Sequence, residues 1–289
     1  MDLEHISISH DLVALSGNTL NIEKNSLLQS SLTVLLNDNH FGKVYFWGKI
    51  FGLDADYYIA FGYHKDLLRH PIYYYSKNAV DWVMLPKPTK TDYFLCQIIT
   101  TRFMGDPSLQ TNVVDDKPTE ENPIPKEPLK VEERNLYWRK HPTYILKEED
   151  RIAATVKLIN KQGIVVPRGA LYKQPNGDIV HNESWYGMNF EDSRLLTSYF
   201  HFRKPENRWD ENVTKKPNYN YAYDFMDPID GDIPLHFAWS CQVVNTNRTA
   251  ILRSLTWPGA VSYNVLESPV WGFLYFGPAK KNIDIPFMI

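Results

Sequence analysis

Cysteine is scarce in this chain of 289 residues, which contains only Cys96 and Cys241. Two cysteines cannot build the disulfide framework of a small secreted fold, and neither lies in a CxxC pair, the spacing typical of zinc and redox sites. We therefore expect both thiols to be reduced and to pack as small apolar side chains in the interior.

Long apolar runs are also absent. No stretch approaches the roughly 18 apolar residues that a membrane-spanning helix requires. The N-terminus, MDLEHISISHDLVALSG, lacks the basic start and the apolar run of a signal peptide. These absences predict an intracellular, soluble protein with no membrane insertion.

Neither sign of charge dominates. The chain carries 31 Lys and Arg against 34 Asp and Glu, for a net charge of −3. Because binding to a phosphate backbone draws most of its free energy from clustered basic residues, we expect no nucleic acid partner.

The linear motifs of common enzyme classes are missing. The sequence contains no GxxxxGK[ST] or GxGxxG phosphate loop, no GxSxG nucleophile elbow and no HExxH zinc motif. We accordingly expect no catalytic residue, no cofactor and no metal. An enzyme whose site is assembled from residues distant in sequence stays an alternative.

Two acidic patterns come nearest to a site. Asp54 and Asp56 alternate onto one face of an extended chain, and paired carboxylates can share a proton or hold a metal. We prefer a hydrated hairpin turn, where aspartate is common. The stretch DFMDPIDGD, residues 224–232, resembles a calcium loop, but Ile229 and Phe237 occupy positions where an oxygen ligand is needed.

Aromatic residues are abundant, with 8 Trp, 18 Tyr and 14 Phe. The stretch GKVYFWGKIFGLDADYYIAFGYH, residues 42–64, concentrates them, and its alternation predicts a β-hairpin. Strict alternation places Tyr45 and Trp47 on one face and Phe46 and Ile50 on the other. Bulky side chains on both faces require cover on both sides, either from this chain or from a partner.

Tyr and Trp combine a large apolar body with a polar group, which suits the centre of a protein interface. We therefore take four residues of this hairpin as interface candidates, namely Tyr45, Trp47, Tyr57 and Tyr58. A peptide-binding module, in which the hairpin recruits one extended strand, is a further alternative.

The periodicity along the rest of the chain predicts an α+β fold, made predominantly of antiparallel β-structure with about three helices. The helices are expected at residues 25–36, 147–163 and 191–202. A second hairpin is expected at 72–85, and C-terminal strands at 237–246, 249–257, 260–265 and 270–277. We expect hairpin 42–64 and these C-terminal strands to share one core.

Composition changes between residues 113 and 142. The run DDKPTEENPIPKEPLKVEER has four prolines, a dense mix of charges and few large apolar residues. Such a segment cannot bury enough surface to offset its ordering entropy, which predicts a mobile insertion. We expect a single domain over residues 1–289, with an N-terminal part at 1–112 and a C-terminal part at 143–289.

Several separate strings carry a resemblance to a known family. In order along the chain they are FWGKIFGLDADYYIA, RFMGDPS, IVVPRGALYK, SYFHFR, DFMD, LRSLTWPGAVSY and KNIDIPFMI. Together they resemble the radial spoke head protein 9 family of motile cilia and flagella. The resemblance covers most of the chain and fails at residues 109–142 and 204–223.

The resemblance implies a non-catalytic structural subunit of the radial spoke head, located in the axoneme. Such a subunit contributes to spoke head assembly and to mechanical signalling between the central pair and the dyneins of the outer doublets. Its implied partners are the other radial spoke head subunits and the projections of the central pair apparatus, and the family implies no cofactor.

Overall fold

The computed structural model describes residues 1–14, 17, 19–114, 143–206, 219–235, 237–244 and 248–287. The predicted insertion lies outside the described residues, apart from its first two positions. The helices of the described part are α1 (Ile6–Val13), α2 (Ile22–Asp38), α3 (Lys90–Ile98), α5 (Glu148–Gly163) and α6 (Phe190–Ser193), with 3-10 turns η1 (Leu3–His5), η3 (Leu196–Ser198) and η5 (Ile285–Phe287). None of these helices combines the length and the apolar character that crossing a membrane requires.

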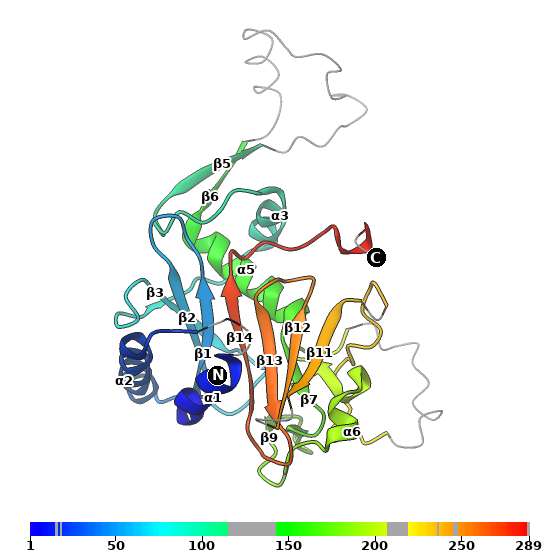
Figure 1. Ribbon diagram of the computed structural model, residues 1–289. Coiled ribbons are helices and arrows are strands. Elements are labelled where there is room, and N and C mark those ends of the chain that lie inside the picture. The colour runs from blue at the N-terminus through cyan, green and yellow to red at the C-terminus, as the bar shows by residue number, and fades with distance from the viewer. Residues whose placement is uncertain are drawn as a thin grey trace, which may run out of the picture.

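An eight-stranded sheet forms the centre of the molecule (Figure 1). Its strands, in spatial order, are β11 (Trp239–Val244), β12 (Thr249–Ser254), β13 (Ala260–Val265), β14 (Trp271–Gly277), β1 (Lys43–Ile50), β2 (Tyr57–Tyr63), β3 (Ile72–Ser76) and β4 (Val83–Met84). Three two-stranded sheets surround it: β5 (Gln110–Val114) with β6 (Thr143–Lys147), β7 (Val165–Pro167) with β10 (Tyr199–His201), and β8 (Leu171–Lys173) with β9 (Ile179–His181).

The main sheet joins the two halves of the chain, because β1 to β4 lie in residues 1–112 and β11 to β14 lie in residues 143–289. Strand β1 pairs in parallel with β14, with Gly48 opposite Tyr275 and Ile50 opposite Gly277. Every other neighbouring pair in this sheet is antiparallel. The predicted α+β class with mostly antiparallel pairing is therefore confirmed, and so is the shared core of hairpin 42–64 and the C-terminal strands.

Both faces of the main sheet are covered by this chain. Helix α5 packs on one face, where Ile152, Val156 and Ile159 belong to the same buried cluster as Trp47 and other aromatic residues. Helices α1 and α2 pack on the opposite face over a second cluster. The sheet is thus the middle layer in Figure 1, and each of its faces carries its own buried cluster.

Two of the three predicted helices are present. Helix α2 starts a few residues before the predicted 25–36, because Asn21 rather than Asn25 caps it by accepting a hydrogen bond from Lys24 N at 2.8 Å. Helix α5 matches the predicted 147–163 closely and has three acidic residues in its first turn, where they complement the helix dipole.

The helix predicted at 191–202 is wrong. Only the short α6 and the turn η3 are helical there, and strand β10 follows. Strand β10 pairs with β7, with Phe200 opposite Val166, and the buried Tyr199 hydroxyl donates to Ser193 O at 2.9 Å. Tertiary pairing therefore overrides the local helical pattern. Helices α1 and α3 are additional to the predicted set.

The predicted faces of strand β1 need one correction. The pairing of β1 with β2 shifts register between Phe46 and Gly48, which inserts one extra residue as a β-bulge. Beyond the bulge the alternation is reversed, so Ile50 belongs to the cluster of Tyr45 and Trp47, whereas Phe46 lies in the other cluster. The prediction that Ile50 shares the face of Phe46 is therefore wrong.

Candidate functional site

The four interface candidates lie in the middle of the main sheet. Tyr45 and Trp47 come from β1, and Tyr57 and Tyr58 from β2. Their exposed fractions are 3%, 0%, 0% and 7%. This chain itself thus supplies the cover that their bulky side chains need. Their role in contacting a partner stays a prediction, although such buried side chains have little surface to offer one.

Trp47 connects the sheet to helix α5. Its indole N–H donates to Asn160 Oδ1 at 2.6 Å, and the Asn160 amide donates to Tyr73 Oη at 2.8 Å. The Trp47 ring also lies 5.3 Å from that of Tyr275 on β14. One side chain therefore contacts strands from both halves of the chain and the helix that covers them.

A buried carboxylate at the start of α5, that of Glu148, forms the second connection between this helix and the rest of the fold. It is 3% exposed and accepts hydrogen bonds from Tyr57 Oη at 2.7 Å, from Met104 N at 2.9 Å and from Gly105 N at 2.7 Å. Burial and the bond to Glu148 raise the pKa of Tyr57 far above its usual range, so the phenol stays a donor. These N–H and O–H donors take the place of the water that would otherwise solvate the buried carboxylate.

On the same face, Tyr45 meets His181 at the end of β9. The Tyr45 hydroxyl and His181 Nε2 lie 2.5 Å apart. Burial, together with the nearby Lys43 ammonium, lowers the pKa of His181 to about 4. The imidazole is therefore neutral at physiological pH and packs as an aromatic ring against Tyr45 and Trp271.

The acidic pair at residues 54 and 56 lies in the connection between β1 and β2. Asp56 forms an ion pair with Lys49 at 2.7 Å and accepts a hydrogen bond from Gly52 N at 3.1 Å. Asp54 is exposed. The Asp56 carboxylate thus holds the turn closed, which is the role that the turn interpretation predicts.

Three of the four carboxylates in the stretch 224–232 are bound by another side chain. The partners are Arg168 for Asp224, Arg203 for Asp227, and both His201 and Trp239 for Asp232. The distances lie between 2.6 and 2.9 Å. These three carboxylates tie the segment to strands β10 and β11 and to the residue that follows β7. They do not converge on one point, so their arrangement differs from that of a calcium loop.

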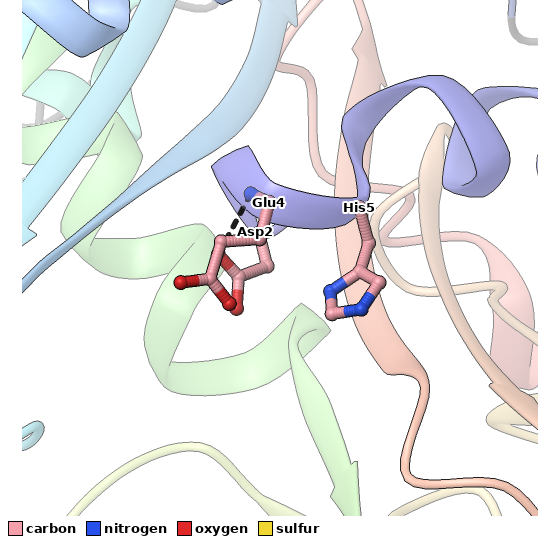
Figure 2. Close-up of side chains that lie close together, drawn as sticks. All are labelled: Asp2, Glu4 and His5. Carbon is pink, nitrogen blue, oxygen red and sulfur yellow. Dashed lines mark hydrogen bonds between the residues drawn. The ribbon is translucent and has the colours of Figure 1, made fainter.

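Asp2, Glu4 and His5 place their ligand atoms within 4.8 Å of one another at the start of the described chain. Figure 2 shows the Asp2 and Glu4 carboxylates side by side, with the His5 ring next to them. Lys43 already supplies a cation, because its Nζ lies 3.2 Å from Asp2 and 3.6 Å from Glu4. The cluster is therefore an ion pair network that ties η1 to β1.

Comparison with known proteins identifies the family. The chain is 35% identical to the radial spoke head protein 9 homolog of Bos taurus and 34% identical to that of Homo sapiens, in both cases over 289 residues and 100% of both chains. Identity to the homolog of Danio rerio is 36% over 291 residues, again covering both chains completely. The chain belongs to the radial spoke head protein 9 family. The sequence model described as Radial spokehead-like protein also matches, at residues 2–67.

The family resemblance expected from short strings is thus confirmed, and it extends over the whole chain. In this member of the radial spoke head protein 9 family, the match at residues 2–67 contains η1, α1, α2 and the hairpin of β1 and β2.

Two residues that organise the interior were not singled out from the sequence of this radial spoke head protein 9 family member. Glu148 lies 91 positions from Tyr57, and Asn160 lies 113 positions from Trp47. Neither pairing has a local spacing rule. The acidic start of α5 was the one available signal, and it indicates a helix N-terminus rather than a buried carboxylate.

Proposed function

We propose that this chain is a non-catalytic structural subunit of the radial spoke head in the axoneme of cilia or flagella. The observation that carries the proposal is the match to relatives named radial spoke head protein 9 homolog over 100% of both chains. A match of this extent includes both layers of helices and all eight strands of the main sheet, rather than one shared module.

The hydrogen-bond partners of the buried polar side chains support a structural role. Glu148 binds backbone N–H groups and a phenol, Asn160 bridges two aromatic side chains, and His181 is neutral and packed. Each of these groups links one element to another. Asp56, Asp224 and Asp227 are likewise bound to basic side chains, and Asp54 is exposed in a turn.

The finer part of the proposal concerns what the subunit does in the assembly. It contributes to spoke head assembly and to mechanical signalling between the central pair and the dyneins of the outer doublets. Its partners are other radial spoke head subunits and central pair projections. A close-packed interior transmits strain instead of absorbing it, and one continuous sheet with a core on each face is suited to carrying load.

We also propose that residues 1–289 form a single domain with residues 113–142 as an insertion. The support comes from the strands on either side of that segment. Strands β5 and β6 pair with each other, with Gln110 opposite Lys147, so the ends of the segment lie together. The parallel pairing of β1 with β14 unites the parts at 1–112 and 143–289.

The test is to replace the endogenous protein in a ciliated cell with a tagged copy. We expect the tag along the axoneme at the spoke heads in cryo-electron tomograms, and we expect loss of the protein to remove spoke head density and disturb beating. Normal spoke heads and normal beating after complete loss of the protein would contradict the proposal. A tag that stays in the cell body would do the same.

A further inference from the structure

An apolar groove of about 790 Å³ crosses one end of the main sheet. Its walls come from the residue after β1, the segment before β11, the connection between β12 and β13, and the C-terminal segment that follows β14. The principal apolar lining residues are Phe51, Phe237, Leu255, Pro258, Phe276 and Ile285. This volume lies within the range of roughly 300–1,000 Å³ that is usual for ligand-binding pockets.

The C-terminal segment is fixed in place as one wall of the groove. Ala279 N donates to the Tyr275 hydroxyl at 2.8 Å, and Asn282 N donates to Thr256 O at 2.8 Å. The side chain of Ile285 is 5% exposed. The groove is therefore bounded by packed structure on both sides.

Large apolar side chains remain exposed at the groove. Phe51, Phe237 and Leu255 are 42%, 51% and 41% exposed. The C-terminal segment also carries Ile283 and Phe287, which lie outside the groove lining and are 73% and 86% exposed. A small molecule in the groove would leave the last two uncovered, whereas a protein segment lying along it can cover the whole group. Exposed apolar groups of this kind mark protein contact sites.

The charge at the groove indicates what such a segment carries. Arg253 lines the groove, and its Nη1 donates to Gln242 Oε1 at 3.0 Å. Among the described residues no carboxylate lies within ion-pair distance of the Arg253 guanidinium. The C-terminal segment adds a net positive charge beside the groove, because it carries the exposed Lys280 and Lys281 against the exposed Asp284. A guanidinium can bind a carboxylate through two parallel hydrogen bonds. A carboxylate on the bound segment would therefore complement the positive charge at the groove.

We propose that this groove binds a segment of another protein that carries apolar side chains next to a carboxylate. The apolar side chains fill the space between Phe237, Leu255 and Phe276, and the carboxylate pairs with Arg253. The proposal rests on the proposed function, because it takes the partner to be another subunit of the spoke head.

Two single substitutions test the groove in the full-length chain. Arg253→Glu reverses the charge that binds the carboxylate, and Leu255→Asp places a charge among the apolar residues. The matched controls are Arg69→Glu, an exposed arginine elsewhere, and Leu195→Asp, at a leucine 53% exposed. Thermal melting of each purified variant first establishes that it folds.

The measured quantity is incorporation of each variant into a spoke head reconstituted from purified subunits. We expect about a tenfold loss for each groove variant, which is the effect of losing one strong contact. We expect the controls to stay within about twofold of the wild type. Wild-type incorporation of both groove variants would overturn the proposal.

A photo-crosslinking residue at position 237 then identifies the occupant in the assembled head. The expected product joins position 237 to a segment of a different subunit in which an aspartate or glutamate neighbours apolar residues. Changing that acidic residue to lysine is expected to restore the incorporation of Arg253→Glu. Crosslinks only to a second copy of this chain, or a co-purified lipid retained in the groove by native mass spectrometry of the assembled head, would overturn the proposal.

The same experiment separates two kinds of failure. If the wild-type chain does not enter the spoke head at all, the proposed function fails. If the wild-type chain enters and the groove variants enter equally well, only the assignment of the groove fails.

Discussion

At the scale of single residues, Trp47 gives the clearest energetic prediction. It is fully buried, contacts strands from both halves of the chain and donates to Asn160. Trp47→Ala should therefore lower the free energy of unfolding of the isolated chain by about 3–5 kcal/mol, since it opens a large cavity and leaves Asn160 Oδ1 without its donor. Urea denaturation measures the loss.

Two comparisons make this prediction specific. Trp47→Phe keeps most of the ring and should cost clearly less than Trp47→Ala, and Tyr186→Ala, at a side chain 80% exposed, should change stability by about 0.5 kcal/mol or less. A Trp47→Ala chain that melts like the wild type but no longer enters the spoke head would instead place this residue at a partner interface.

Glu148 gives a second prediction at this scale. Glu148→Gln retains the size of the side chain but replaces one acceptor oxygen with an N–H₂ donor, which would face the N–H groups of Met104 and Gly105. We expect a loss of about 2 kcal/mol or more in the free energy of unfolding, because buried donors lose their acceptor. Glu23→Gln, in the exposed first turn of α2, is the matched control and should cost only a few tenths of a kcal/mol.

His181 predicts a pH dependence of stability. Its pKa in the folded chain is about 4, below the ordinary value of 6.5. As the pH falls below 6.5, the unfolded chain takes up a proton that the folded chain does not, so stability decreases until about pH 4 and then levels off. Between pH 7 and pH 5 this group should cost about 2 kcal/mol.

The variant His181→Gln isolates that contribution. Burial also lowers the pKa of His10, so the wild type combines at least two groups that act in the same direction. We expect the stability of His181→Gln to decrease less between pH 7 and pH 5 than that of the wild type, as measured by urea denaturation at both pH values. An identical decrease would mean that His181 has the same pKa in the folded chain as in the unfolded chain.

At the scale of elements, the turn between β1 and β2 should tolerate the loss of its charges. The ion pair between Asp56 and Lys49 is partly exposed, and such pairs contribute about 1 kcal/mol or less. The double variant Asp54→Asn with Asp56→Asn should therefore lower the free energy of unfolding by about 1 kcal/mol at most. It should also enter the spoke head normally, and a folded variant that fails to do so would assign this turn a direct role in assembly.

The elements also show what a sequence alone can predict here. The helices α2 and α5 and the hairpin of β1 and β2 follow from local periodicity and capping, which the sequence contains. The missed helix α3 begins with a complete capping box of Thr89 and Asp92, a signal that was available. By contrast, β10 is a strand only because β7 lies beside it.

The face of Ile50 depends in the same way on nonlocal structure. The bulge that reverses the alternation of β1 lies between Phe46 and Gly48, and the backbone of Gly48 closely approaches β14. The buried contacts of Glu148 and Asn160, and the groove that runs between four separate segments, likewise exist only once distant parts of the chain are packed together. No local pattern contains that information.

At the scale of the whole molecule, stability should depend on the strand pairing between the halves and hardly at all on the segment between β5 and β6. The cost of closing such a segment grows only with the logarithm of its length, so deleting residues 116–127 should change the free energy of unfolding by about 0.5 kcal/mol. That corresponds to a shift of roughly 1 °C in Tm, which thermal melting resolves. A loss of many degrees would mean that this segment is part of the core.

The variant to compare with that deletion is Gly48→Ala. It adds a single methyl group where β1 of the N-terminal part pairs with β14 of the C-terminal part. Gly48 has a φ of 147°, and a Cβ there would lie 2.1 Å from the carbonyl oxygen of Tyr275 on β14. Since two strands would have to move apart, we expect a loss of more than about 2 kcal/mol and a drop of several degrees in Tm. If Gly48→Ala melted no lower than the deletion variant, the pairing of β1 with β14 would not be what holds the N-terminal and C-terminal parts together.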